Sequence, residues 1–190
     1  MRTLEVVHES FDSQFQGSYI GRYILVMGAN LTIKEASDSE IIMREDNPEM
    51  FQMMMEFFYE MKLRPEFTKI RRYDANPVKP VLEPIIALYT LANKYDADLL
   101  QRTLVDTFKT ATGAYGGTLS KAELEALVHA HYPFCNKTLC PMSEAIATLI
   151  VKNGTALLRD GSIDPLIIQY GNLGGDLLIS ARRSGRLILK

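Results

Sequence analysis

A segment rich in methionine and phenylalanine, residues 48–61, limits more than any other feature how this chain can fold. Its polar residues recur at helical spacing along one narrow stripe, at Glu49, Gln52, Glu56 and Glu60. Apolar and aromatic side chains cover the rest of the circumference, and such a helix must be packed on most sides. We therefore predict a buried helix over 48–61. The alternative is an adaptable methionine-rich binding surface, which is the rarer use of such residues.

Start signals delimit this helix and several others. The segment 46–49 (Asp-Asn-Pro-Glu) offers an N-cap side chain, a proline at the first helical position and an early carboxylate. Ser120 and Glu123 form a capping box, and Leu119 with Leu124 makes a hydrophobic staple. Together with apolar periodicity, such signals predict further helices over 84–95, 97–111, 121–132, 143–158, 165–170 and 175–184.

Short apolar runs near the amino terminus favour strands instead. Residues 23–27 and 31–33 flank a Gly-Ala-Asn sequence at 28–30, where glycine and asparagine tolerate the positive φ of a tight hairpin, and the run 41–43 is too brief for a helix. Residues 62–82 combine prolines with basic side chains, which predicts an exposed loop. The predicted fold class is therefore α+β and mostly α-helical, with a small sheet packed on helices and an all-helical carboxyl-terminal half.

Composition excludes several classes of protein. The chain has 190 residues, of which 47% are apolar and 23% charged, with a net charge of −2. These proportions fit a folded, soluble chain and neither a disordered nor a membrane-spanning one. The isoelectric point of about 5.9 argues against a general nucleic-acid binder, which needs a concentrated basic face. The one basic cluster, at Arg182, Arg183, Arg186 and Lys190, is interpreted as a favourable contact with a helix end plus a solvated tail.

The amino terminus predicts an intracellular protein. Glu5 and His8 interrupt the first apolar stretch before a signal-peptide core can form. We therefore expect a cytoplasmic or nuclear location, in which Cys135 and Cys140 stay reduced.

The residues that offer most chemistry are His129, His131, Cys135 and Cys140, four metal-ligand types within a short stretch. Their spacing differs from that of familiar zinc sites, and the two histidines lie about 200° apart on a helix. The favoured interpretation is a helix end followed by a loop with two ordinary thiols. A metal-binding domain or metal-dependent enzyme built on these four residues remains the alternative.

No other motif predicts catalysis. The glycine-containing run 171–175 has no lysine and no preceding strand, so we expect an interhelical turn rather than a phosphate-binding loop. The histidines belong to no nucleophile motif. The sequence therefore provides no support for a catalytic residue, a cofactor, a bound metal or a small-molecule substrate.

Three segments, taken in order, resemble the second half of a BTB/POZ domain. They are residues 40–51, with a strand and an acidic-proline cap, residues 55–59, with a Phe-Tyr pair ending a buried helix, and residues 88–100, which include Leu-Ala-Asn-Lys-Tyr at 91–95. The long loop and the helical extension are most similar to the stand-alone BTB proteins abundant in fungi. The resemblance implies a BTB/POZ-like domain over 1–112, in which residues 1–33 are atypical. A helical extension follows over 113–190.

The resemblance implies a non-enzymatic protein-interaction module. Relatives act as self-associating scaffolds or as substrate adaptors of cullin-based ubiquitin ligases, so the expected partners are a second copy or a cullin scaffold, with no nucleic acid and no membrane. The expected interaction face draws on the loop around Leu63 and Phe67, on Tyr89, and on a helix containing Leu124, Leu127 and Val128. A second alternative is a degenerate BTB copy without a partner. The family's dimer interface uses the first strand and helix, and residues 1–33, where these are expected, are atypical.

Overall fold

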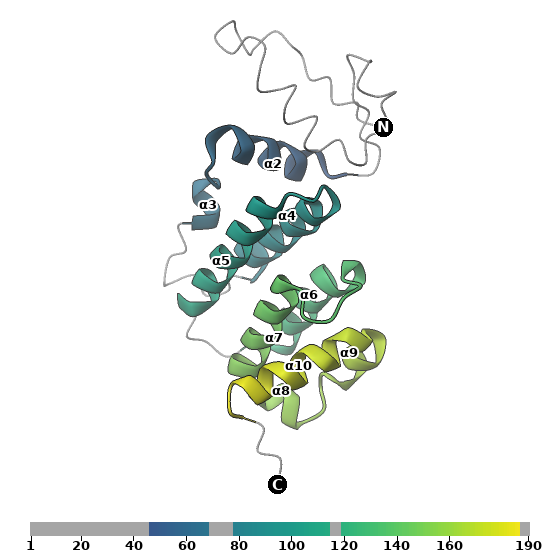
Figure 1. The fold of residues 1–190 in the computed structure, drawn as a ribbon. Helices are drawn as coiled ribbons and strands as arrows, with labels where there is room; N and C mark the ends of the chain where they lie inside the picture. Colours follow the sequence, from purple (N-terminus) through teal and green to yellow (C-terminus); the bar gives the residue numbers. More distant parts are fainter. Residues whose placement is uncertain (1–45, 69–77, 115–118, 187–190) are drawn as a thin grey trace, which may run out of the picture.

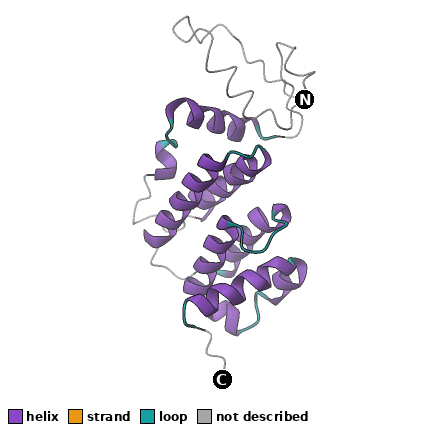
Figure 2. Cartoon of the chain, viewed as in Figure 1, coloured by secondary structure: helices purple, strands orange, loops and turns teal. Residues whose placement is uncertain are grey.

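The computed structural model describes residues 46–68, 78–114 and 119–186. Every regular element in these ranges is helical. Residues 48–68 lie at one end of the described part, 78–114 lie in the middle, and the helices of 121–183 lie together at the other end (Figures 1 and 2). The elements are α2 (Pro48–Glu60), α3 (Pro65–Thr68), η2 (Val78–Leu82), α4 (Glu83–Lys94), α5 (Asp98–Ala114), α6 (Lys121–His131), η3 (Tyr132–Phe134), α7 (Pro141–Asn153), α8 (Thr155–Arg159), α9 (Asp164–Gln169) and α10 (Gly171–Arg183). None of these helices is long and apolar enough to cross a bilayer.

The predicted α+β fold class is wrong for this part of the chain. The described ranges contain no strand and no sheet, because their apolar residues repeat every three or four positions, the spacing of a helix rather than a strand. The strands expected at 23–27, 31–33 and 41–43 lie outside the described residues. The predicted helical character of the carboxyl-terminal half is confirmed over 119–186.

Helix α2 confirms the helix predicted for the methionine-rich segment, but not its packing on most sides, because Tyr59 and Met61 are exposed. The side chain of Asn47 caps it by accepting hydrogen bonds from the backbone N–H groups of Glu49 and Met50, at 2.9 and 3.4 Å. The face with Met53, Met54 and Phe57 is buried, and α2 packs against α4. The side chain of Met54 is completely inaccessible to solvent.

The exposed loop predicted over 62–82 is wrong in part. The segment contains the short helix α3 and the π-helical turn η2. Phe67, Val78, Val81 and Leu82 are buried in the core. Burial of these side chains stabilises ordered helical turns, whereas the prolines alone suggest an irregular loop. Residues 69–77 lie outside the described part.

One hydrophobic core extends through the described parts of both predicted segments, 1–112 and 113–190. Helices α4 and α5 pack together as a hairpin, and each also contacts the carboxyl-terminal half, α4 through α6 and α5 through α7. Ser120 and Glu123 form the predicted capping box at the start of α6. The two halves therefore stabilise each other through shared apolar contacts.

Two boundaries in the carboxyl-terminal half differ from prediction. The single helix expected over 143–158 is divided into α7 and α8 at Gly154, where an added Cβ would lie 2.9 Å from the carbonyl oxygen of Ile150. Helix α10 begins at Gly171, so the run 171–175 is its first turn and not an interhelical turn. Gly174 and Gly175 allow neighbouring side chains to approach the helix closely.

The basic cluster lies at the carboxyl end of its own helix, as predicted, with Arg182 and Arg183 in the last turn of α10, but its side chains also contact α7. Arg186 donates hydrogen bonds to the carbonyl oxygens of Val151 and Lys152, at the carboxyl end of α7, and Arg183 forms an ion pair with Glu144. These contacts hold the end of α10 against α7.

Candidate functional site

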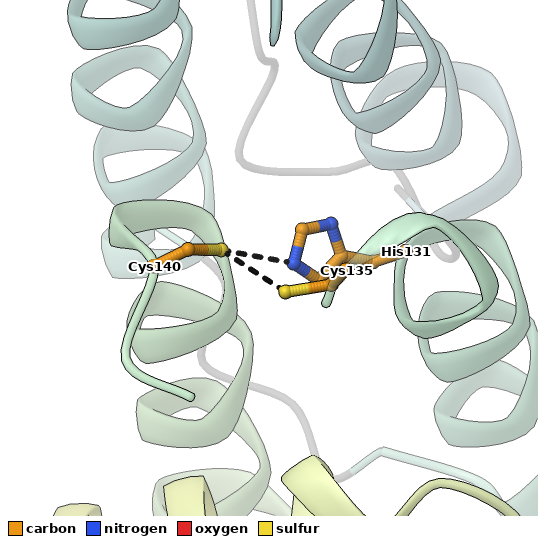
Figure 3. Close-up of side chains that lie close together, drawn as sticks. All are labelled: His131, Cys135 and Cys140. Carbon is orange, nitrogen blue, oxygen red and sulfur yellow. Dashed lines mark hydrogen bonds between the residues drawn. The ribbon is translucent and has the colours of Figure 1, made fainter. Parts of the chain in front are cut away.

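Three side chains with metal-binding and nucleophilic chemistry meet beside the start of α7. His131 ends α6, Cys135 follows the turn η3, and Cys140 precedes α7 (Figure 3). The Sγ atom of Cys140 lies 3.4 Å from Sγ of Cys135 and 3.3 Å from Nε2 of His131. All three potential ligand atoms lie within 4.8 Å of one another. We call these residues the thiol–imidazole cluster.

The backbone positions Cys140 as the N-cap of α7. Its Sγ accepts the N–H of Ser143 at 3.4 Å, and the hydroxyl of Ser143 donates back to the carbonyl oxygen of Cys140 at 2.9 Å. Pro141 occupies the first turn, where its missing N–H has no cost. Leu139 adopts a left-handed conformation, with φ 62°. The chain therefore turns sharply into α7 and directs Cys140 toward α6.

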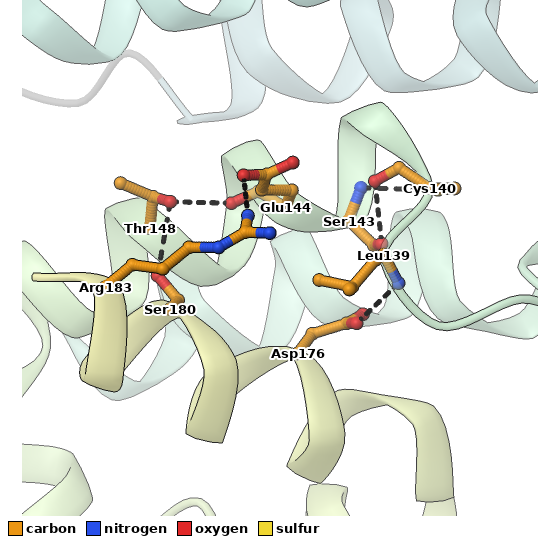
Figure 4. A network of polar contacts seen from close by, with 8 residues as sticks. All are labelled: Leu139, Cys140, Ser143, Glu144, Thr148, Asp176, Ser180 and Arg183. Carbon is orange, nitrogen blue, oxygen red and sulfur yellow. Dashed lines mark hydrogen bonds and ion pairs between the residues drawn. The ribbon is translucent and has the colours of Figure 1, made fainter. Parts of the chain in front are cut away.

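Helix α10 supports both sides of the loop that carries the two cysteines. The buried carboxylate of Asp176 accepts the backbone N–H of Leu139 at 2.7 Å and the hydroxyl of Tyr132 at 3.1 Å (Figure 4 shows the first contact). Asn172 donates its side-chain amide to the carbonyl oxygen of Cys135 at 3.1 Å. A single face of α10 thus determines where both thiols lie.

The two thiols differ in acidity. Hydrogen bonding from Cys135, together with contacts from His131 and Ser143, lowers the pKa of Cys140 against the opposing effect of burial. Hydrogen bonding with Cys140 and burial raise the pKa of Cys135. A thiolate at Cys140 beside a thiol at Cys135 is the arrangement that these contacts favour. Both side chains are half-buried.

Aromatic rings enclose His131, which is buried. The ring centroids of Tyr132 and Tyr89 lie 5.3 and 6.0 Å from its imidazole. Burial, followed by the contact with Cys140, raises the pKa of Tyr89 well above its usual range. Among the described residues Nδ1 of His131 has no hydrogen-bond partner. The imidazole is therefore held mainly by packing and by its contact with Cys140.

Of the four candidate metal ligands identified from the sequence, three lie together in the structure and one lies apart. His131, Cys135 and Cys140 come together. His129 lies apart and exposed, with Nδ1 3.0 Å from the hydroxyl oxygen of Tyr170. A set of two sulfurs and one imidazole suits a borderline divalent metal such as zinc.

The supporting residues Asp176 and Asn172 were not predicted from the sequence, although Asp176 carries a recognisable signal. Asp176 occupies the same helical face as Leu173, Leu177 and Ser180, all of which are buried. A carboxylate on an otherwise apolar face needs hydrogen-bond donors from another element. Asn172 carried no comparable signal, since an asparagine near a glycine is common in turns.

The structure places most of the predicted interaction residues in the core. Phe67, Tyr89, Leu124, Leu127 and Val128 are buried, and Leu63 is half-buried. Their side chains therefore pack inside the molecule. A protein partner would have to contact exposed neighbours of these residues.

A separate contact joins two of the segments that carry the resemblance. Asp46, before α2, accepts a hydrogen bond of 2.6 Å from the hydroxyl of Tyr95 and one of 2.8 Å from the ammonium group of Lys94, at the end of α4. The rings of Phe51 and Tyr95 meet edge to face, with centroids 6.0 Å apart. Burial and the nearby Asp46 carboxylate raise the pKa of Tyr95 above its usual range. The cap of α2 is thus tied to the end of α4.

Comparison of the chain with protein-family models, with curated proteins and with solved structures finds no match.

Proposed function

We propose that this protein is a non-enzymatic protein-interaction module of the BTB/POZ type, which acts as a self-associating scaffold or as a substrate adaptor for a cullin-based ubiquitin ligase. The observation that carries the proposal is the contact of Asp46 with Lys94 and Tyr95. The resemblance rests on segments far apart in the sequence, and this contact brings their most characteristic residues together.

The contact is built to hold two helices in one arrangement. The carboxylate of Asp46 is only 10% exposed and receives donors from two consecutive residues. A charge-assisted hydrogen bond in a partly buried position is stronger than one between neutral groups in water. The start of α2 is therefore fixed against the end of α4, as a constant scaffold for a partner surface would require.

The exposed end of α2 is the surface that we propose for the partner. Tyr59 and Met61 are 58% and 53% exposed, and they lie four and two residues before Leu63 of the expected interaction loop. Tyrosine and methionine are enriched at protein interfaces. These two side chains are suited to make the contacts that the buried residues cannot.

Affinity capture from native extract tests the proposal, with two differently tagged copies of the full chain and mass spectrometry of the proteins recovered. We expect the second copy or a cullin scaffold to be recovered with the wild-type chain. The double variant Tyr59→Gln, Met61→Asn should lose most of that recovery, since asparagine suits the left-handed backbone of Met61.

The variant Ile168→Gln is the matched control. Ile168 is 84% exposed on α9, in the other half of the molecule. Circular dichroism should show unchanged helicity in both variants. Recovery of neither partner by the wild-type chain, or equal recovery by all three proteins, would contradict the proposal.

A further inference from the structure

We propose that the thiol–imidazole cluster binds one zinc ion, through Nε2 of His131 and the Sγ atoms of Cys135 and Cys140. The three atoms come from different parts of the chain, the end of α6, the loop after η3 and the N-cap of α7 (Figure 3). The inference does not depend on the interaction function proposed above.

Two of the three distances between the ligand atoms approach those of a zinc centre. Zinc binds sulfur at about 2.3 Å and imidazole nitrogen at about 2.0–2.1 Å, so a tetrahedral site has an S–S edge of about 3.8 Å and an S–N edge of about 3.6 Å. The corresponding distances here are 3.4 Å between the two Sγ atoms and 3.3 Å between Sγ of Cys140 and Nε2 of His131. The third pair, Sγ of Cys135 and Nε2 of His131, lies within 4.8 Å, so these two side chains would approach each other by up to about 1.2 Å to bind one ion.

The surroundings hold the ligands from outside the cluster. Asp176 fixes the backbone of Leu139 beside Cys140, and Asn172 fixes the carbonyl of Cys135. Both supports come from α10, 36 residues or more along the chain from the cysteines that they position. Such positioning of ligands by a second layer of hydrogen bonds is usual around protein-bound metals.

Two features define the kind of site. Three protein ligands leave a fourth position, which solvent would occupy because both cysteines are only partly buried. Within the described chain Nδ1 of His131 has no hydrogen-bond partner. Metal-binding histidines usually donate this second ring N–H to a neighbour, and loss of that neighbour lowers metal affinity roughly 10–100-fold. We therefore infer an exchangeable zinc ion rather than a permanently held one.

The test is titration of the reduced, full-length protein with cobalt(II), followed by displacement with zinc(II). We expect one equivalent of cobalt per chain, the visible bands of tetrahedral cobalt and intense thiolate-to-cobalt charge-transfer absorption. Zinc should abolish these bands and raise the melting temperature, because an ion that binds only the folded chain stabilises it.

Variants assign the ligands. Cys140→Ser should abolish the charge-transfer band while keeping the N-cap, because a serine hydroxyl can also accept the N–H of Ser143. Cys135→Ser should abolish stoichiometric binding, and His131→Gln should weaken binding at least about tenfold. His129→Gln is the matched control, since His129 lies on the same helix outside the cluster, and it should bind cobalt like the wild-type chain.

Three results would overturn the proposal. One is the absence of charge-transfer absorption from the reduced wild-type chain at cobalt concentrations that saturate ordinary thiolate sites. Another is equal binding by the wild-type and Cys140→Ser proteins. The third is an isolated protein that contains a Cys135–Cys140 disulfide, seen as a mass lower by two hydrogen atoms, and that does not bind metal after reduction. The two cysteines would then be a redox couple only.

Discussion

Helices α2–α5 and α6–α10 use polar side chains in different ways. All the buried polar side chains of the described residues, Glu123, His131, Ser143, Asp176 and Ser180, belong to the second group. In α2–α5 the core is apolar, and the main polar contact between helices, that of Asp46 with Tyr95, lies at its rim. A buried polar group is costly unless it has partners, so the second group is where geometry most restricts the side chains and where a specific chemical site is most expected.

In helices α2–α5, the apolar half, a single buried charge should cause the largest loss of stability. Met54→Asp should lower the free energy of unfolding by about 3–5 kcal/mol, because it places a carboxylate with no partner at a fully buried position. Urea denaturation followed by circular dichroism measures the change. Gln52→Asp, on the exposed side of the same helix, is the control and should cost less than about 1 kcal/mol. Similar losses in both variants would refute burial of the methionine face.

In helices α6–α10, the polar half, substitution of Asp176 should cause the largest loss of stability. Asp176→Ala leaves the N–H of Leu139 and the hydroxyl of Tyr132 without their acceptor, and each unsatisfied buried group costs about 1–3 kcal/mol. We expect a loss of about 2–4 kcal/mol in the free energy of unfolding, measured by urea denaturation, together with weaker cobalt binding.

The control for Asp176→Ala is Asp164→Ala, which removes an exposed carboxylate at the start of α9. It should cost less than about 1 kcal/mol and leave cobalt binding unchanged. If Asp176→Ala destabilises the chain but binds cobalt as tightly as the wild-type protein, then α10 supports the fold without positioning the cysteines.

The same contrast explains which features could be predicted from sequence. The caps at Asn47 and Ser120 were predictable, because each uses donors within three residues along the chain. The contact between Leu139 and Asp176 joins residues 37 positions apart, and no local signal encodes such a pairing. The start of α10 at Gly171 was missed for a related reason, since Gly174 and Gly175 serve close packing and not a turn.

The thiol–imidazole cluster was half predictable. Helical geometry correctly separated His129 from His131. It did not reveal that the turn η3 and the left-handed Leu139 return the chain, so that Cys135 and Cys140 both lie beside His131. The predicted sheet is not seen in the described ranges, where every segment has helical spacing, and the strand patterns at 23–27, 31–33 and 41–43 lie outside those ranges.

The smallest expected effect concerns a polar contact at the surface of the apolar half. Arg64 donates to both carboxylate oxygens of Glu56, at 2.6 and 2.8 Å, and lowers the pKa of Glu56 below its usual value. A carboxylate with a lowered pKa in the folded chain adds stability above its unfolded-state pKa of about 4.5, and this stability is lost as the pH falls through the folded-state pKa.

Solvent screening limits this contribution, since the Glu56 side chain is 35% exposed. Glu56→Gln should therefore lower the free energy of unfolding by at most about 0.5 kcal/mol at pH 7. Urea denaturation at pH 7 and at pH 3 measures the difference, which should shrink at the lower pH as Glu56 becomes protonated. A cost above about 2 kcal/mol, or one that grows on acidification, would mean that this surface contact behaves like the buried polar groups around Asp176.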